Sequence, residues 1–576
     1  MSEGPLQRFP WLPRVLPWAL VLFALGFRLM GIGWGLPTAD RYHSLHPDEE
    51  VILRYSQQIN PAGLDFDPGF YNYGTLYLTL LKVTSDVVTA YGGGPDPRQP
   101  ASVAAYVARL HMGGRVLSAV AGAAMVLFVF WICRRWLDFW PSIAGAAAVA
   151  VAPGLVVHSR FQTVDVVAAF FLVVSAYFSL RLIPDANREE AHPARLALLS
   201  GLFAGLSAGV KYTGVLVMLC LFAVVFYRPR PERLRLIVTG GAAALIAFVL
   251  TTPGILTNTG KFLEDFRYEM AHTSTGHGLI FTNTLPGYLF HLENLTVAMG
   301  PILAAMGLVG LIGGIWKRQP WAVALGLFFL AYFVLIGRAE VKFLRYVFPL
   351  IPVLAVGFAY AMQAAHRRGG VARLGVVIGI FGLFGVDPGG GLRSAATMTG
   401  WMAGEDPRDV AGKRLRDLAA ERPIRVGLAS DPWFYTPTLY PEVGAMRPFY
   451  SSALRARNPE YRQPLDFMTA ARRPEVVLYL PPLIDDRYSW DVRLLEEIAP
   501  DYVVISSFEA VDPARLADAT NLTGPEKLQV DRAKAFRDRL TQDYEVAYRD
   551  GGGGPAIHDM HYIRPEIWTW VRKTTR

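Results

Sequence analysis

Three consecutive carboxylates stand near the beginning of this chain, in the stretch LHPDEEVILRY at residues 45–55. Asp48, Glu49 and Glu50 follow a proline, which suits the first position of a helix, and acidic side chains in a first turn complement the helix dipole. A helix that begins at Pro47 is therefore the simplest interpretation. The alternative is chemical: a carboxylate placed here can act as a general base and take a proton from an attacking hydroxyl group.

Four other short stretches carry ionisable and polar residues between apolar runs: HSRFQTVD, GVKYTG, GRAEVKFLRY and DFRYEMAHTSTGHG. Arginine and lysine can hold a phosphate group and stabilise the charge of a departing phosphate. Ionisable groups at membrane depth are costly, so they are usually functional or paired. The alternative for each basic residue is that its side chain extends to the membrane surface from a helix end. The candidate substrate-binding residues are Arg28, Arg160, Asp165, Lys211, Tyr212, His277, Lys342, Arg345 and Tyr346.

The composition is that of a membrane protein. Of the 576 residues, 52% are hydrophobic and only 18% are charged, against roughly 25% charged in a typical soluble domain. A helix crosses the hydrocarbon core with about 20 residues, and eleven apolar runs approach that length. The first run carries Arg28 and lacks a small-residue cleavage site, so we expect it to be a span and not a signal peptide. The runs lie at approximately 14–34, 115–132, 140–157, 164–183, 195–210, 212–227, 234–252, 297–315, 320–337, 344–363 and 371–387.

Lysine and arginine are distributed unequally between the two sides of these runs. With the N-terminus in the cytoplasm, the cytoplasmic segments hold 16 of them and the short loops on the other side hold 5. The positive-inside rule therefore predicts a cytoplasmic N-terminus, and an odd number of spans places the C-terminus outside. The net charge of +8 follows mostly from this topology and does not indicate nucleic acid. Cys133 and Cys220 fall inside apolar runs, which excludes a disulfide framework or a thiolate metal site.

The predicted fold class is a mainly α membrane protein with about 11 spans over residues 1–388, followed by an extracytoplasmic α/β domain at 389–576, called the tail below. Two outer segments, 36–114 and 253–296, are too long to be simple turns. For Arg28 we favour a pair with an acidic residue of the first outer segment, with extension to the membrane surface as the alternative. In the tail, the β-rich runs PIRVGLAS, EVVLYL and DYVVISSF alternate with helical stretches such as PRDVAGKRLRDLAAE and LTGPEKLQVDRAKAFRDRLTQD. Such alternation favours a largely parallel sheet.

The first outer segment contains two helix-like stretches, 47–60 and 71–90. The former places Ile52, Tyr55 and Ile59 on one helical face, which predicts an amphipathic helix along the membrane interface. The latter is aromatic and apolar, and we expect a second interfacial helix there, with an additional span as the alternative. Residues that are adjacent on a helix point about 100° apart, so Asp48 and Glu49 cannot serve the same purpose. We expect Asp48 to be the base and Glu49 to orient it.

Taken in order, these motifs resemble those of a known superfamily. Arg28 late in the first span, the Asp48-Glu49 pair, SRFQTVD, AGLSAGVKYTG and VKFLRYVFPLIP are similar to the motifs of GT-C fold integral-membrane glycosyltransferases, which include protein O-mannosyltransferases and lipid A aminoarabinose transferases. The likeness covers roughly residues 10–365. The family's usual His-Pro-Pro segment is absent, and PGFYNYGTLY occupies its approximate place.

The resemblance implies a polyprenyl-phosphate sugar as donor, an inverting hexosyl or pentosyl transfer, and an extracytoplasmic acceptor that is a glycan, a lipid or a protein. It implies that Asp48 is the general base and that basic residues such as Lys211 and Lys342 contact the phosphate or the acceptor. It also implies an integral plasma (inner) membrane protein whose site and tail face the extracytoplasmic side. No cofactor is required by this chemistry.

Three alternatives remain open from the sequence. A transporter or flippase of lipid-linked sugars also has many spans, but we find no similar halves, and the polar residues lie at one surface. A divalent metal could be held by His43, His46, Asp48 and Glu49, although their spacing matches no standard metal motif. A protein that only binds cell-envelope polymer would not need a membrane part of this size.

The topology gives a first testable prediction. Reporter enzymes fused after residue 400 should be active when the reporter requires the extracytoplasmic side, because the charge asymmetry places the tail there. Parallel fusions in the basic loop near Arg230 serve as the control and should report the cytoplasm. Tail fusions that are active only in the cytoplasm would contradict the predicted orientation.

Overall fold

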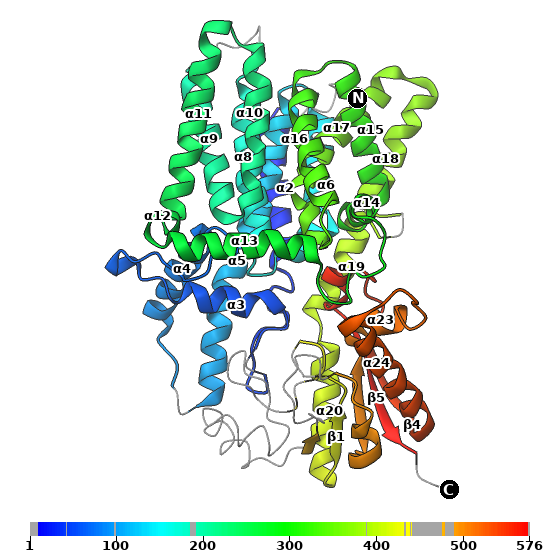
Figure 1. Cartoon of the computed structure of the whole chain (residues 1–576). Coiled ribbons are helices and arrows are strands. Elements are labelled where there is room, and N and C mark those ends of the chain that lie inside the picture. Colours follow the sequence, from blue (N-terminus) through cyan, green and yellow to red (C-terminus); the bar gives the residue numbers. More distant parts are fainter. Residues whose placement is uncertain are drawn as a thin grey trace.

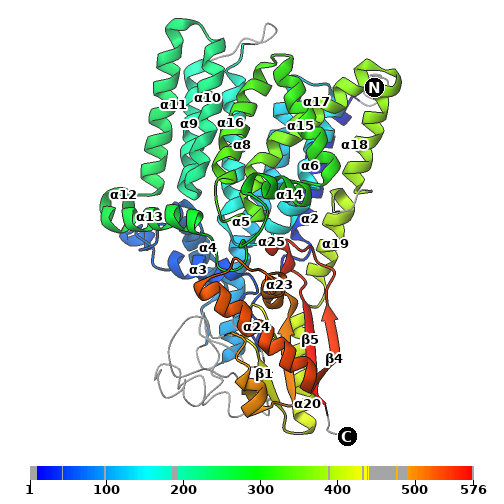
Figure 2. The same ribbon diagram turned by 45° about the vertical axis from the view of Figure 1, so that its right-hand side comes forward.

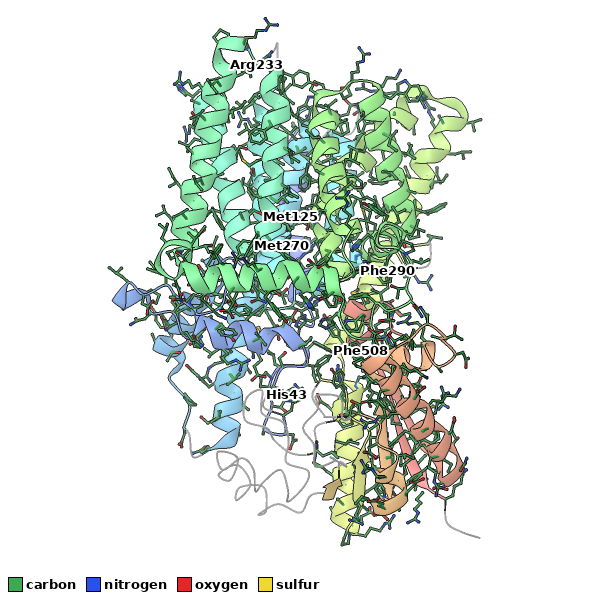
Figure 3. The ribbon with its side chains drawn as sticks, in the orientation of Figure 1. His43, Met125, Arg233, Met270, Phe290 and Phe508 are labelled. Carbon is green, nitrogen blue, oxygen red and sulfur yellow. The ribbon has the colours of Figure 1, made fainter. Side chains whose placement is uncertain are left out.

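The computed structural model describes residues 10–41, 43–96, 99–184, 192–386, 389–430, 434–437, 439, 475–477 and 489–573. A bundle of long helices occupies one end of the molecule, and a smaller sheet with its helices occupies the other (Figure 1). The beginning of the described chain lies at the far end of the bundle from the tail. Figure 3 shows Arg233 at that same far end, whereas Phe508 lies in the tail and His43 lies at the end of the bundle that faces the tail.

Seven helical segments within the described residues are long and apolar enough to cross a membrane. They are α2 (Leu12–Leu29), most of α5 (Pro100–Arg134), α8 (Val164–Arg181), α9 (Pro193–Val210), α11 (Arg230–Thr251), α16 (Pro320–Gly337), and η4 (Leu344–Leu350) together with α17 (Ile351–Arg368).

The other predicted spans are shorter or bent. Helices α14 (Gly287–Met299) and α15 (Pro301–Trp316) meet at 114° and could count as an eighth span if taken as one. Three shorter apolar segments are α6 (Phe139–Ala150), the stretch Tyr212–Tyr227 that contains α10 (Met218–Val224), and the stretch Gly370–Phe384 that contains α18 (Leu374–Phe384). Each of the eleven predicted apolar runs thus coincides with a helical segment, but only seven have the full length of a span.

Glycine allows two pairs of helices to approach each other very closely. A Cβ atom placed on Gly201 of α9 would lie 1.9 Å from the carbonyl oxygen of Gly240 in α11, and one on Gly310 of α15 would lie 1.8 Å from that of Gly357 in α17. Small residues at such crossings let backbones pack directly in a membrane, where van der Waals contact drives helix association. These two contacts let α9 pack directly on α11 and α15 directly on α17.

A set of shorter helices runs across the end of the bundle that faces the tail (Figures 1 and 2). The first outer segment contributes α3 (Pro47–Ser56) and α4 (Leu76–Gly92), close to the two stretches predicted from the sequence. The second contributes α12 (Gly254–Thr257) and α13 (Thr259–Thr275). The apolar face of α3 packs on protein: Ile52 of α3, and Ile59 just beyond its end, are buried in one cluster with Leu78 and Leu81 of α4.

The tail is connected to the bundle by α19 (Gly391–Ala403) and forms an α/β sandwich. Its strands are β1 (Arg425–Leu428), β2 (Glu475–Val477), β3 (Tyr502–Ser506), β4 (Tyr544–Gly551) and β5 (Glu566–Arg572), and its helices are α20 (Pro407–Glu421), α23 (Ser507–Arg515), α24 (Gly524–Asp543) and α25 (His558–His561). Successive residues of β3 point to opposite faces. Accordingly, Tyr502 and Val504 pack with the residues of α20, and Val503 and Ile505 pack with those of α24.

The sheet is mixed and not largely parallel as predicted. The described strands are ordered β2-β1-β3-β5-β4, with parallel pairing of β1 to β2 and to β3, but antiparallel pairing of β5 to β3 and to β4. Strands β4 and β5 were not predicted from the sequence, since charged residues interrupt β4 and a long connection with α25 separates it from β5. The last three residues of EVVLYL fall outside the described part of the chain.

The close contact of α9 and α11 yields a stability prediction. Gly201→Ala should separate these helices, because the added methyl would overlap the Gly240 carbonyl, and overpacking of this kind costs about 1–3 kcal/mol. Gly241→Ala is the matched control, since a Cβ there meets no atom within 4 Å. The measurement is the midpoint of thermal unfolding in detergent. Equal midpoints for the two variants would mean that the helices do not pack as described.

Candidate active site

A cavity of about 590 Å³ lies between the end of the bundle and the tail. Figure 3 marks the region with Phe508, one of the lining residues, below the end of the bundle. The polar residues that line the cavity come from the first outer segment, the second outer segment, η4 and the tail. They include His46, Asp48, Tyr73, Glu269, His277, Arg345, Tyr346, Glu509, Asp512, His558 and Tyr562.

Asp48 reaches this cavity because of the way α3 begins. The ring nitrogen Nδ1 of His46, the N-cap residue, accepts the backbone N–H of Asp48 at 3.2 Å. Pro47 occupies the first helical position, as the sequence predicted. The side chain of Asp48 is 32% exposed, and its Oδ2 lies 3.5 Å from Nη2 of Arg345. A carboxylate that is accessible and still beside a cation is suited to accept a proton from a bound hydroxyl group.

Glu49 points away from the cavity and is fully buried. Arg115 of α5 donates from Nε to Oε1 at 2.8 Å and from Nη2 to Oε2 at 2.7 Å, and the backbone N–H of Gln162 donates to Oε1 at 2.7 Å. The Ser44 hydroxyl also donates to this carboxylate. Burial alone would raise the pKa of Glu49, but the charge and hydrogen bonds of Arg115 outweigh it and lower the pKa to about 2. Glu49 is therefore an ionised anchor for α3.

Arg345 is the centre of a cluster of charges on the cavity wall. Its Nη1 donates to Oδ2 of Asp559 at 3.2 Å, its Nη2 lies 3.5 Å from Asp48, and its Nε lies 3.9 Å from Oδ2 of Asp165. Lys211 donates to the other oxygen of Asp165 at 2.6 Å. Five of the predicted site residues thus meet here: Asp48, Asp165, Lys211, Arg345, and Tyr346, whose ring centre lies 4.7 Å from the Lys211 ammonium.

Tyr212 and His277 lie at the margins of the site. The Tyr212 hydroxyl donates to the carbonyl oxygens of Tyr71 at 2.7 Å and Tyr73 at 3.0 Å, so it supports the cavity wall from behind. His277 lines the cavity, with Nδ1 3.3 Å from Nε2 of His272. Burial and the neighbouring His272 lower the pKa of His277 to about 4, which keeps its ring neutral near pH 7.

Arg28 and Arg160 are buried away from the cavity lining. Arg28 donates to Ser159 and to the carbonyl oxygens of Ala24, Val149 and Ala150. The interpretation that pairs Arg28 with an acidic residue of the first outer segment is therefore wrong: backbone carbonyls at the end of α6 satisfy its guanidinium. Arg160 similarly donates to backbone carbonyl oxygens, among them those of Met30 and Phe27.

Lys342 also lies outside the residues that line the cavity. Its ammonium group donates to the Thr284 hydroxyl at 3.1 Å and to the Leu285 carbonyl oxygen at 3.2 Å, and it lies 3.8 Å from Glu340. These contacts connect the loop between α13 and α14 to the segment before η4. The geometry supports a structural contribution by Lys342, and its contact with substrate stays a prediction.

The described residues contain no group of three or more His, Cys, Asp or Glu side chains that could hold a metal ion. Of the four residues considered for such a site, Glu49 has its carboxylate oxygens engaged by Arg115, Ser44 and Gln162. Asp48 faces the cavity instead, and Nδ1 of His46 is engaged by the backbone. These four residues therefore do not form a common set of ligands.

Sequence reasoning missed several residues that shape the site. Arg115 stands in a long apolar helix, where a single arginine gives no indication of its partner. Glu509 follows Ser506 by three residues, a capping-box spacing that is present in the structure, and burial raises its pKa to about 7. Asp559 and Tyr562 occur in HDMHY, a short polar stretch without a recognised spacing. Only a tertiary contact shows that the tail delivers these side chains to the cavity.

Comparisons with known proteins agree with this fold. The family model described as dolichyl-phosphate-mannose-protein mannosyltransferase matches residues 104–256, a stretch that contains Arg115, Asp165 and Lys211. A comparison with the sequences of curated proteins gives no match.

Solved structures provide the second comparison. ArnT from Cupriavidus metallidurans in the apo state is 14% identical, with a TM-score of 0.50 over 98% of this chain and 98% of ArnT. The same protein bound to undecaprenyl phosphate gives 14% identity and a TM-score of 0.48, over 99% and 98% of the two chains. The archaeal oligosaccharyltransferase AglB from Archaeoglobus fulgidus, in complex with an inhibitory peptide and a dolichol-phosphate, gives 13% identity and 0.46, over 88% and 71%.

The likeness to apo ArnT shows a shared fold. The predicted fold class, a mainly α membrane protein of the GT-C type with a small sheet near its C-terminus, is confirmed, and so is the resemblance to GT-C glycosyltransferases. Together with the family-model match, these findings support a membrane glycosyltransferase.

The buried pair of Glu49 and Arg115 gives a prediction for stability. Arg115→Met should unfold or strongly destabilise the protein, because removing one partner of a buried ion pair costs about 3–5 kcal/mol. Arg109→Met, on the same helix, is the control: Arg109 donates to the carbonyl oxygens of Gly92 and Gly93 at 3.4 and 3.2 Å in exposed positions and has no buried charged partner among the described residues. The readout is the thermal unfolding midpoint in detergent, and equal midpoints for the two variants would contradict a stabilising pair.

The same pair fixes a dependence on pH. The pKa of Glu49 falls from 4.5 to about 2 on folding, so its contribution to stability is fully present above about pH 4.5 and is lost as the pH falls toward 2. In Glu49→Gln this component should be absent, which gives a flatter decline of the unfolding midpoint between pH 5 and pH 3. Parallel declines in the two proteins would show that Glu49 is not held ionised by Arg115.

Proposed function

We propose that this protein transfers a hexose or a pentose from a polyprenyl-phosphate donor to an extracytoplasmic glycan, lipid or protein, with inversion at the anomeric carbon. The observation that carries the proposal is the contact of Asp48 with Arg345 on the wall of the cavity at the end of the membrane bundle. The matched family is named for dolichyl-phosphate mannose, a sugar on a polyprenyl phosphate, which supports this class of donor.

The cation of this pair suits the phosphate of the donor. Arginine has five N–H donors, and the 3.2 Å bond to Asp559 is the only side-chain hydrogen bond of Arg345 among the described residues. The face of the guanidinium lies 3.9 Å from the centre of the Phe343 ring, which leaves its N–H edges unoccupied by that contact. The Asp48 and Asp165 oxygens lie 3.5 and 3.9 Å away, beyond a strong hydrogen bond, so the Nη2 and Nε edges can turn to a phosphate. A polyprenyl phosphate in the outer leaflet would carry its phosphate at the membrane surface, where η4 begins.

The carboxylate of the pair suits the acceptor. In the proposed reaction Asp48 takes the proton of an acceptor hydroxyl while that oxygen forms a bond to the anomeric carbon. The bond from the anomeric carbon to the phosphate oxygen breaks, and the electron pair leaves on the polyprenyl phosphate. Arg345 stabilises the charge that grows on this leaving group. A single displacement of this kind inverts the anomeric centre.

The predicted cations are expected to contribute unequally. Arg345 lines the cavity. Lys211 lies farther from it and is bonded to Asp165, the carboxylate that stands between Lys211 and Arg345. Lys342, Arg28 and Arg160 satisfy their donors elsewhere. We therefore propose that donor binding depends on Arg345 first and on Lys211 second. The division near residue 388, into a catalytic membrane domain and an extracytoplasmic tail domain, is part of the same proposal.

The activity can be tested directly with purified protein in nanodiscs. Incubation with a panel of polyprenyl-phosphate hexoses and pentoses, together with candidate acceptors, should release free polyprenyl phosphate from at least one donor. The release should depend on the presence of an acceptor. If no donor is consumed but labelled lipid-linked sugar crosses the bilayer of proteoliposomes, the protein is a transporter or flippase and the proposed transfer is wrong.

Substitution of Asp48 tests the proposed general base most directly. Asp48→Asn should reduce turnover by about 10²–10⁴-fold, the usual contribution of a positioned general base, with donor binding and the unfolding midpoint nearly unchanged. Glu50→Gln is the matched control, since Glu50 is a carboxylate of the same helical turn that does not line the cavity. Near-normal transfer by Asp48→Asn would mean that the acidic stretch only begins a helix.

A further inference from the structure

A short polar segment of the tail, His558–Tyr562, reaches the charged cluster of the bundle. It contains α25, which packs beside η4 and so places Asp559 next to Arg345. Asp559 is fully buried, and its Oδ2 accepts both the backbone N–H and the Nη1 of Arg345, each at 3.2 Å. One carboxylate oxygen thus holds the main chain and the guanidinium of the same residue.

Asp559 is the nearest of the three carboxylates that surround this guanidinium. The two others, Asp48 and Asp165, lie 3.5 and 3.9 Å away; Asp48 lines the cavity, whereas Asp165 is nearly buried and bonded to Lys211. Burial would raise the pKa of Asp559, but Arg345 lowers it well below the usual range, so this carboxylate is charged near pH 7. A hydrogen bond between two charged groups is roughly twice as strong as one between neutral groups.

The arrangement matters because Arg345 also stands beside the proposed base. Without the partner on the tail side, the attraction of opposite charges would draw the guanidinium onto Asp48, which is already 3.5 Å away. A guanidinium that closes on Asp48 occupies the oxygen that must accept the proton. It also turns its Nη2 edge away from the place of the phosphate.

We infer that Asp559 is a positioning residue: it holds Arg345 away from Asp48, so that the base stays accessible and the guanidinium faces the leaving phosphate. This inference rests on the proposed transfer reaction. It gives the tail a defined purpose, because a side chain of the tail sets the position of a guanidinium that η4 contributes to the site.

Tyr562 supports the view that this segment belongs to the site. Its side chain is 2% exposed and lines the cavity, and its hydroxyl has no hydrogen-bond partner among the described residues. Its ring centre lies 5.4 Å from that of His46, the residue that begins α3. A buried polar group usually has a partner, so this buried hydroxyl of a cavity-lining residue is a candidate to receive one from a bound molecule.

The test is a double-mutant cycle on the full-length protein in nanodiscs. Kinetics are measured for Asp559→Asn, Arg345→Gln and the double variant with a donor that the wild type consumes. Asp559→Asn should lower kcat by roughly 10-fold to 100-fold, the effect of a misplaced catalytic group, with a smaller change in the KM for the donor. In the Arg345→Gln background the same change should cost almost nothing further, since residues that act through one contact are not additive.

Asp550→Asn is the matched control. Asp550 also belongs to the tail and accepts from an arginine, Arg414, at 2.9 Å, but it lies outside the residues that line the cavity. Its variant should keep the wild-type kcat. Should Asp559→Asn not fold, Asp559→Glu keeps the charge and moves the carboxylate by one methylene, and it should lower kcat by a smaller factor.

A folded Asp559 variant with wild-type kcat would overturn the inference, and so would losses that multiply independently in the double variant. Both results are distinct from failure of the proposed function. In that case the wild type itself would release no polyprenyl phosphate from any donor of the panel.

Discussion

The buried ion pair of Glu49 and Arg115 is the interaction on which the geometry of the site depends. The Arg115 guanidinium binds the Glu49 carboxylate with two N–H groups and also donates to the carbonyl oxygens of Ile32 and Trp34. It therefore connects the chain that leaves α2, the first turn of α3, and α5. Because adjacent residues of a helix diverge by about 100°, anchoring Glu49 inward directs Asp48 outward to the cavity. Because both side chains are fully buried, water does not compete for their hydrogen bonds, and the geometry of the pair is firmly held.

The cavity joins parts of the chain that are distant in sequence. The base comes from the first outer segment, the guanidinium from the turn before α17, and its closest carboxylate from the tail. Lys211 and Asp165 stand behind them as a second ion pair at the ends of α9 and α8. The cluster holds three carboxylates around one arginine, and a phosphate that enters would compete with Asp48 and Asp165 for its N–H groups. Such competition offers a physical route by which donor binding could release the base for catalysis.

The sequence was informative where a local rule determines the structure. Proline and three acids predicted the start of α3, and apolar length predicted helices in all eleven runs, because burial in lipid leaves a helix as the available form for such segments. The divergence of Asp48 and Glu49 also followed from helix geometry alone. Length did not distinguish a full span from a shorter or bent helix such as α6 or the α14 and α15 pair.

The parts that the sequence could not predict depend on partners. Arg28 looked like a counterion for the first outer segment, but carbonyl oxygens at the end of α6 satisfy it. Asp559 gave no signal, since its neighbour Arg345 is more than two hundred residues away. Strands β4 and β5 pair through a connection that contains α25, so no short hairpin turn marks them. In each case the sequence does not show which distant residue or strand is the partner.

The most direct test of this account is a structure of the protein with undecaprenyl phosphate bound in a nanodisc. The account predicts that the phosphate lies in the cavity between the bundle and the tail, within hydrogen-bond distance of the Arg345 guanidinium and beside Asp48. A phosphate bound at the opposite end of the bundle, near Arg233, or one that does not contact Arg345, would contradict it.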